Sequence, residues 1–268
     1  MLIAEEMGVS GLFLELTKRG LHWKTMRMTA DQIKALPARQ RTIVVDGCAY
    51  ASVLCFYDVV YGGCFRRMHS TANDIVKNFI SLGFKLLVVV DGSLDKAKVS
   101  TWARRRRSEL NRMAQYPKYI TDLNAGVKSS KYAKAASGSV ISIKSLLVEL
   151  FKDAGCSVIM SAVEADREAA QLCITKGYFG VLSSDSDYLA LGVPMLISST
   201  SVSFSDNAVT FKYYSNADVC SALGVGRDFL PLFVSLCSLS SKFAFILCDH
   251  ALLFFFVTDW ERLLEMTL

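Results

Sequence analysis

The stretch that decides the fold is Val163–Gly192, which reads VEADREAAQLCITKGYFGVLSSDSDYLALG. Its first part is an amphipathic helical pattern with acids at its start, and its second part is a short apolar run, Phe179–Leu182, with acids directly after it. The acids of the stretch are Glu164, Asp166, Glu168, Asp185 and Asp187. Carboxylates gathered in this way repel one another and resist ionising together. Hard oxygen ligands of this kind suit Mg²⁺ or Mn²⁺, so the stretch predicts a divalent-metal site.

Two further segments repeat the pattern of an apolar run followed by an acid. Arg41–Asp46 reads RTIVVD and Lys85–Val90 reads KLLVVV, and each leads into Asp-Gly. Continuous apolar strands that alternate with helical segments predict a parallel sheet covered on both faces. In such sheets the loops at the carboxyl ends of the strands line the ligand crevice. We therefore expect four acids from distant parts of the chain to meet at one edge: Asp46, Asp91, Glu164 and Asp185.

The expected elements cover most of the chain. We expect helices over the following segments: one entered from a loop within Met7–Gly20, and others at Ala49–Tyr61, near Thr71–Leu82, Thr101–Met113, Ile141–Ala154 and Asn216–Leu223. Central strands are expected at Arg41–Asp46, Lys85–Val90, Ser157–Met160 and Phe179–Leu182. Shorter edge strands are expected at Met195–Ile197, Val202–Phe204 and Val209–Tyr213. The order predicts one α/β domain followed by a tail.

Composition narrows the class of protein. The 268 residues are 52% hydrophobic, which is enough for a sizeable core and excludes wholesale disorder. The eight cysteines show no CxxC pair, so we expect free thiols in a reducing compartment and no zinc site. The apolar segment Phe243–Val257 has about 15 residues and carries Asp249 and His250, so we do not expect it to span a membrane.

Basic residues are clustered rather than spread. The net charge is +5, and Lys96–Arg107 holds six of the 30 lysines and arginines. Lys98 and Arg105 are seven residues apart, which places them on one face if they share a helix, where they could grip a scissile phosphate. The Lys-, Ser- and Gly-rich segment 116–140 reads as an insertion that could track a nucleic-acid backbone, with tyrosines for base stacking. A solvated helix face and a flexible loop are the structural alternatives.

Five motifs in order resemble the XPG/flap-endonuclease superfamily. They are MGVSGL at Met7–Leu12, VVDGCAY at Val44–Tyr50, VVVDG at Val88–Gly92, EADREAA at Glu164–Ala170 and LSSDSDYLALG at Leu182–Gly192. When LPLFVSLC at Leu230–Cys237 is added to these five motifs, the set is most similar to asteroid-type single-strand DNA endonucleases. The resemblance implies a PIN-like α/β nuclease domain over residues 7–237, with a gateway insertion at 116–140 and an atypical apolar tail at 238–268.

The resemblance also implies a site. Its two metal ions, Mg²⁺ or Mn²⁺, would be held by Asp46, Asp91, Glu164, Asp166, Asp185 and Asp187. Lys98 and Arg105 fall at the catalytic basic positions, and the residues expected to contact nucleic acid are Arg104, Arg106, Lys128, Lys131 and Tyr50. The implied activity is hydrolysis of flap, overhang or single-stranded DNA that leaves 5′-phosphate ends, in nuclear DNA repair.

The chain departs from the family pattern at three places. Met1–Glu6 precedes the motif that usually begins the family, and the expected stacking tyrosine falls at Ser52, with Tyr50 nearby. After Cys237 the motif that carries the last acidic ligand is replaced by SLSSKFAFILCDH. Two alternatives to a DNA endonuclease therefore stay open: a nuclease-fold binding or scaffold protein without catalysis, and an RNase of the broader PIN class.

Overall fold

The structure is a computed structural model that describes residues 11–50, 65–92, 99–114, 121, 144–162 and 164–239. The α-helices are α1 Leu12–Lys18, α2 Ala30–Ala35, α4 Phe65–Leu82, α5 Val99–Met113, α8 Lys144–Asp153, α9 Ala165–Lys176, α10 Asp187–Ala190, α11 Asn216–Leu223 and α12 Leu230–Leu239. Two 3₁₀ turns are η2 Ala38–Arg41 and η5 Arg227–Phe229. The strands are β1 Lys24–Thr29, β2 Thr42–Asp46, β3 Lys85–Val90, β4 Ser157–Met160, β5 Gly180–Ser183, β6 Met195–Ser198, β7 Ser203–Ser205 and β8 Ala208–Ser215.

A mixed sheet runs through the centre of the molecule. Its order is β1-β8-β6-β5-β2-β3-β4, with β7 also paired to β8. The pairs β4–β3, β3–β2, β2–β5 and β5–β6 are parallel, whereas β8 pairs antiparallel with β6, β7 and β1. All the strands that precede the predicted acids are therefore parallel neighbours, and their carboxyl ends share one edge.

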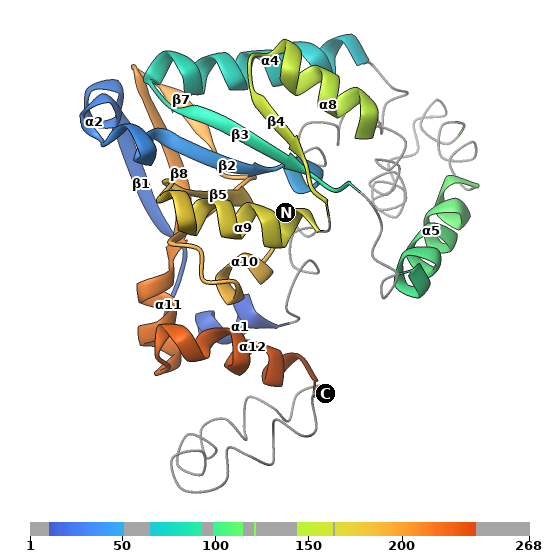
Figure 1. Cartoon of the computed structure of the whole chain (residues 1–268), viewed down its shortest axis with the longest axis vertical. Helices are drawn as coiled ribbons and strands as arrows, with labels where there is room; N and C mark the ends of the chain where they lie inside the picture. The colour runs from blue at the N-terminus through green and yellow to red at the C-terminus, as the bar shows by residue number, and fades with distance from the viewer. Residues whose placement is uncertain are drawn as a thin grey trace, which may run out of the picture.

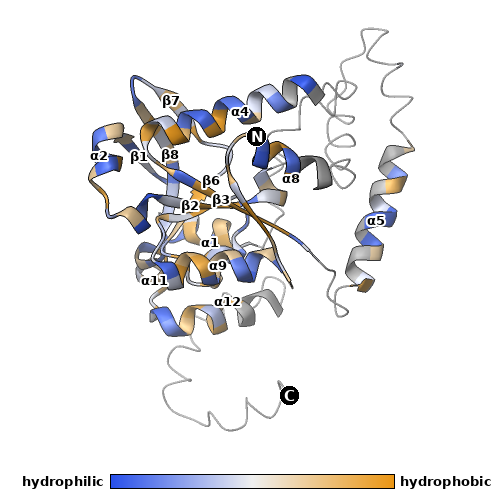
Figure 2. Cartoon of the chain, turned by 45° about the horizontal axis from the view of Figure 1, so that its top comes forward, coloured by the Kyte–Doolittle hydropathy of each residue, from blue (hydrophilic) through white to orange (hydrophobic). Residues whose placement is uncertain are grey.

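Alternate residues of the central strands feed two separate cores. In β2, Val44 packs into one cluster of buried side chains and Val45 into the other, and Val89 and Val88 of β3 alternate in the same way. A strand buried on both faces must be largely apolar, which explains the unbroken apolar runs in β2 and β3. Figure 2 shows the hydrophobic colour along β3.

Helices cover both faces of the sheet. Phe79 of α4 and Phe151 of α8 pack in one core, while Cys173 of α9, Leu189 of α10 and Leu230 of α12 pack in the other. Figure 1 shows α4 and α8 on one side of the sheet and α9, α10 and α12 on the other. Helix α5 stands apart from the sheet in both views (Figures 1 and 2).

Glycine permits one close approach inside the sheet. A Cβ atom on Gly180 of β5 would lie 2.7 Å from the carbonyl oxygen of Met195 in the neighbouring strand β6. No real Cβ approaches an oxygen so closely, so any larger residue would push β5 and β6 apart.

Most expected elements are confirmed, with differences of a few residues at their ends. The strands β3 and β4 and the helix α11 have the expected bounds, and α4 begins six residues before Thr71, at Phe65. The expected helix Ala49–Tyr61 begins at Gly47, and its residues from Ala51 onward lie outside the described part of the chain. Within that described part, no helix combines the length and apolar character that crossing a bilayer requires.

The edge-strand predictions were wrong in two places. The strand β6 lies between β5 and β8, and β8 lies between β6 and β1, so both are interior strands. The end of the sheet beyond them is β1, which was not predicted from the sequence. Its sequence, KTMRMT, has no β-branched run, and its side chains are exposed or half-buried. It becomes a strand through six residue pairs with β8, far away in the chain.

Candidate metal centre

Three aspartates form a group with the spacing of metal ligands. One carboxylate oxygen each of Asp166, Asp185 and Asp187 lies within 4.8 Å of the other two, and all three residues are partly buried. In the sequence, the rest of α9 and the strand β5 separate Asp166 from the other two. The fold therefore brings together the two halves of the stretch that predicted the site.

Local structure fixes the positions of these acids. Asp166 lies in the first turn of α9, where the positive end of the helix favours a negative charge. Asp185 follows β5, and its backbone N–H donates to Ser183 Oγ over 3.1 Å. The backbone N–H of Asp187 in turn donates to Asp185 Oδ1 over 2.9 Å, at the start of α10.

Asp46 ends β2 and is only 5% exposed. Its carboxylate accepts hydrogen bonds from the backbone N–H of Ala49 and from Ser183 Oγ, both over 3.0 Å. Burial raises the pKa of Asp46, and these two hydrogen bonds oppose that rise. The bond to Ser183 links the end of β2 directly to the end of β5.

Asp91 follows β3 and is held between two elements. Its Oδ1 accepts a hydrogen bond from the backbone N–H of Ala165, the first residue of α9, over 3.2 Å. Its Oδ2 accepts one from Cys48 Sγ over 3.5 Å. The contact to Ala165 joins the end of β3 to the beginning of the acidic helix.

Electrostatics place Asp166 at the centre of the cluster. Burial, and after it the negative charges of Asp46, Asp185 and Asp91, raise the pKa of Asp166 to about 7. The hydroxyl of Tyr188 donates to Asp166 Oδ1 over 3.3 Å, and burial beside these acids raises the pKa of Tyr188. A cluster in which one carboxylate resists ionisation has an excess of negative charge. This donor set, all oxygens, fits a hard divalent cation.

The two glutamates of the acidic stretch lie outside the group of three aspartates. Glu164 immediately precedes α9, and its Oε2 lies 3.7 Å from Arg167 Nε. Glu168 Oε2 accepts a hydrogen bond from the backbone N–H of Ala162 over 3.3 Å. Glu168 thus holds the loop that enters the helix.

The predicted basic residues are only partly described. Arg104 is exposed and Arg106 half-buried on α5, and Arg105 lies between them with its side chain outside the described part. Lys98, Lys128 and Lys131 also lie outside the described residues. Their roles stay predictions.

Tyr50 requires a correction. It is 2% exposed and belongs to the core cluster that α4 and α8 cover. A base cannot stack on a ring that is enclosed by other side chains, so Tyr50 is a core residue in this structure. Cys48, Ser183 and Tyr188, which hold the acids, were not predicted, because side-chain hydrogen bonds across strands leave no pattern in the sequence.

The fold and part of the sequence match known proteins. Residues 155–240, which include the acidic stretch, match the family model of the XPG I-region. The structure resembles human GEN1, solved in complex with Holliday junction DNA, with a TM-score of 0.52 and 14% identity. That match covers 88% of this chain and 51% of the GEN1 chain. The protein therefore has the PIN-like fold of the XPG-type nucleases.

Relatives of similar sequence are named as coactivators and not as nucleases. The bovine constitutive coactivator of peroxisome proliferator-activated receptor gamma is 26% identical over 201 residues, which is 75% of this chain and 28% of the relative. The human constitutive coactivator of PPAR-gamma-like protein 1 is 24% identical over 194 residues, which is 71% of this chain and 17% of the relative. The chain thus spans less than a third of the length of either relative.

Proposed function

We propose that the protein is a divalent-metal-dependent DNA endonuclease that cuts flap, overhang or single-stranded DNA. The observation that carries the proposal is the group formed by Asp166, Asp185 and Asp187 at the carboxyl edge of an XPG-type fold. Carboxylates in this number destabilise one another unless cations balance them, and cations are what phosphodiester hydrolysis needs.

We assign the six acids to two sets that share Asp166. The first set adds Asp185 and Asp187, which belong to the same group of three. The second set adds Asp46 and Asp91, whose charges, like that of Asp185, raise the pKa of Asp166. We assign the sixth acid, Glu164, to this second set because it lies two residues before Asp166. Two Mg²⁺ or Mn²⁺ ions, one for each set, would supply Lewis-acid stabilisation of the charge that develops on the phosphate.

The remaining residues orient the site and the substrate. Ser183 and the backbone N–H groups of Ala49 and Ala165 hold Asp46 and Asp91 in place, which matters because small positional errors cost large factors in rate. Lys98 and Arg105 would position the scissile phosphate, and the exposed Arg104 of α5 would contact the strand beyond it. The DNA complex of the structurally similar GEN1 supports DNA as the substrate class.

We further propose the finer assignments that the resemblance implied. These are an asteroid-type nuclease domain over residues 7–237, a place in DNA repair, and a location in the nucleus. A fluorescent fusion examined before and after DNA damage tests the last two assignments. Exclusion of the fusion from the nucleus under both conditions would contradict them.

The alternative is a nuclease-fold binding protein without catalysis. The observation that favours it is the naming of the relatives as coactivators, although they match over less than a third of their length. In that case the acids would remain as a structural cluster, and nucleic acid or a protein partner would bind without being cut.

The test is a cleavage assay with flap, overhang and single-stranded DNA in Mg²⁺ or Mn²⁺. The decisive variant is Asp185→Asn, since an amide oxygen can still accept from the backbone N–H of Asp187. The matched control is Asp206→Asn, the same chemical change at an exposed turn. We expect cleavage by the wild type and the control, and at least about a 100-fold loss in Asp185→Asn. Equal cleavage by all three would refute the site. Binding without cleavage by the folded wild type would favour the alternative.

A further inference from the structure

Positive charges line the amino ends of the central strands. Arg41 directly precedes β2, Lys85 begins β3, and Lys176 ends the helix α9 that leads into β5. These three strands are parallel neighbours, and Thr42 of β2 is opposite Lys85 in the register, so the strands begin at one edge of the sheet. We define the basic edge as the side chains of Lys34, Arg39, Arg41, Lys85 and Lys176.

Contacts place the other two charges at the same edge. A Cβ atom on Gly177 would lie 3.6 Å from Arg39 Cδ, so the Arg39 side chain lies against the turn that follows Lys176. A Cβ atom on Gly83 would lie 3.2 Å from Lys34 Cγ, and Gly83 is two residues before β3. Figure 1 shows α2 near the start of β2, on the side of the sheet from which the arrows of β2 and β3 run. Charges from α2, η2, β3 and α9 therefore meet there.

The basic edge is open to solvent and is not balanced by acids. Four of its residues are exposed and Arg41 is half-buried. Within the described part of the chain, none of the five forms an ion pair. The segments that carry them, 34–42, 83–86 and 176–180, contain no Asp or Glu. The acids of the metal centre lie instead at the opposite ends of the same strands.

Helix ends explain only part of this charge. Lys34 and Lys176 lie in the last turns of α2 and α9, where the negative end of the helix favours a cation. Lys85 begins a strand, and Arg39 and Arg41 belong to the four-residue 3₁₀ turn η2. Like charges on neighbouring strands repel one another. A bound polyanion would relieve this repulsion.

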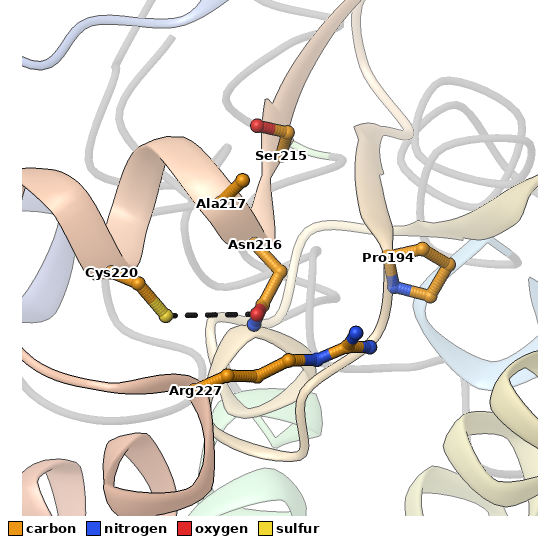
Figure 3. Close-up of a pocket in the computed structure, with 6 residues that line it drawn as sticks. All are labelled: Pro194, Ser215, Asn216, Ala217, Cys220 and Arg227. Carbon is orange, nitrogen blue, oxygen red and sulfur yellow. Dashed lines mark hydrogen bonds between the residues drawn. The ribbon is translucent and has the colours of Figure 1, made fainter.

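The charge excess ends at the strands on either side. At β6, Arg227 lies in a small pocket with Pro194 (Figure 3). Its Nη2 donates to the carbonyl oxygen of Gly192 over 3.2 Å, and Asp228 follows it in the sequence. On the other side, β4 is preceded by α8, which ends in Lys152–Asp153, a pair without net charge. The basic edge is thus confined to β5, β2 and β3.

We propose that the basic edge binds the phosphate backbone of a nucleic acid. Phosphates are bound by positive charge and N–H donors, which lysine and the forked guanidinium of arginine both supply. An acidic polypeptide is a poorer match, because protein interfaces have an apolar centre. Among the described residues, none of the large apolar side chains that are exposed belongs to the segments of the basic edge.

The basic edge contacts a part of the nucleic acid different from the one at the acids. β2 has five residues and β3 has six, which at about 3.3 Å per residue separates the two edges by roughly 16–20 Å. The nucleic acid at the basic edge is therefore held and not cut. This binding goes beyond the proposed nuclease function, since it needs neither metal nor cleavage and applies equally to a catalytically inactive protein.

The test is fluorescence anisotropy of a labelled single-stranded oligothymidylate with the full chain in EDTA, where no free metal supports cleavage. The decisive variant combines three changes at exposed residues, Arg39→Gln, Lys85→Gln and Lys176→Gln. The matched control makes the same change at exposed cations of α1, β1 and β8, in Lys18→Gln, Arg27→Gln and Lys212→Gln. Both variants lose the same net charge.

The salt dependence of binding reports the lost contacts. Each phosphate contact to single-stranded DNA contributes about 0.7 to the slope of log affinity against log salt concentration. We expect the decisive variant to reduce this slope by about 2 and to bind at least about tenfold more weakly at about 0.1 M salt. The control should change the slope by less than about 0.5. Lys85→Gln alone should reduce it by about 0.7, which keeps the test available if the triple variant fails to fold.

Three outcomes would count against the proposal. Absence of binding by the folded wild type, or equal weakening in the two triple variants, would overturn it. Poly-glutamate that displaces the oligonucleotide as well as unlabelled DNA does would overturn the nucleic-acid assignment. The nuclease proposal is tested separately, because Asp185→Asn should keep the binding at the basic edge in EDTA while it loses cleavage in Mg²⁺.

Discussion

Replacing Asp166 by Asn should stabilise the protein when divalent metal is absent. The change removes a carboxylate whose ionisation the folded protein opposes, yet an Asn side-chain oxygen can still accept the hydrogen bond from Tyr188. Most charge removals in a folded protein are neutral or harmful, so an increase in stability would be a specific sign of an unbalanced cluster.

The size of the effect follows from the difference in pKa between the folded and unfolded protein. Asp166 has a pKa of about 7 in the folded protein, against 3.8 for an ordinary aspartate. A difference of one in pKa corresponds to about 1.36 kcal/mol, which gives an upper limit of roughly 4 kcal/mol. Water and side-chain rearrangement will reduce this, so we expect about 2 kcal/mol, or an increase in Tm of roughly 4–8 °C.

The sign depends on pH. Because the folded pKa is raised, the favourable contribution of the protonated Asp166 is complete below about pH 3.8 and is lost as pH rises through about 7. The advantage of Asp166→Asn over the wild type should therefore be smaller at pH 5 than at pH 8 and largest above pH 7. Urea unfolding in EDTA at pH 5 and pH 8 measures it, with Asp206→Asn as the control for charge removal at an exposed position.

Metal should reverse the order of stability. Mg²⁺ or Mn²⁺ binds the folded wild type and raises its free energy of unfolding with concentration, whereas Asp166→Asn should gain much less. A variant that is less stable than the wild type in EDTA at pH 8 would refute the reasoning. So would a stability difference that does not increase between pH 5 and pH 8.

Three other predictions test the fold and its charges. Gly180→Ala should destabilise the protein by about 2 kcal/mol or more in chemical unfolding, because the added Cβ would lie 2.7 Å from a carbonyl oxygen. In the control Gly226→Ala the nearest atom to the added Cβ lies at 3.5 Å, so the free energy of unfolding should change by less than about 0.5 kcal/mol. Burial raises the pKa of the Cys173 thiol to about 12, so iodoacetamide at pH 8 should label it only after unfolding, as mass spectrometry of digested protein would show. Lys24 lowers the pKa of Asp218, so the stability that this pair adds is present at neutral pH and is lost as pH falls through the lowered pKa. Lys24→Gln should therefore make the free energy of unfolding depend less steeply on pH in acid. An unchanged pH profile would contradict this.

The sequence predicted the parts of the fold that depend on local pattern. Continuous apolar runs identified β2 and β3, and the positions of Asp46 and Asp91 at the ends of these runs predicted the shared edge from the residues alone. The parallel registers and the electrostatic influence of both aspartates on Asp166 agree with that expectation. Parallel strand ends are a strong constraint because every strand of the set must finish on the same side.

What the sequence did not predict depends on partners far along the chain. The strand β1 has a mixed sequence and forms because β8 offers it a complete set of backbone partners. Likewise, Ser183 is important because it donates to a carboxylate that lies 137 residues earlier in the chain. Tyr50 was misjudged for the same reason: aromatic residues stack on bases or fill cores, and only the packing of α4 and α8 decides between the two.

The hydrogen bonds that hold Asp46 and Asp91 affect what the presence of these two residues in a related protein says about its activity. Each of these aspartates anchors a backbone N–H, at Ala49 and at Ala165. Purifying selection on stability alone would preserve them in a descendant that had ceased to cut nucleic acid. The charge of Asp166 is a burden on the folded chain without a cation, and its hydrogen bond comes from the side chain of Tyr188 instead of a backbone N–H. Neutral drift in an inactive descendant would replace Asp166 first. The frequency of Asp166 among orthologues is therefore a better indicator of retained nuclease activity than the frequency of Asp46 or Asp91.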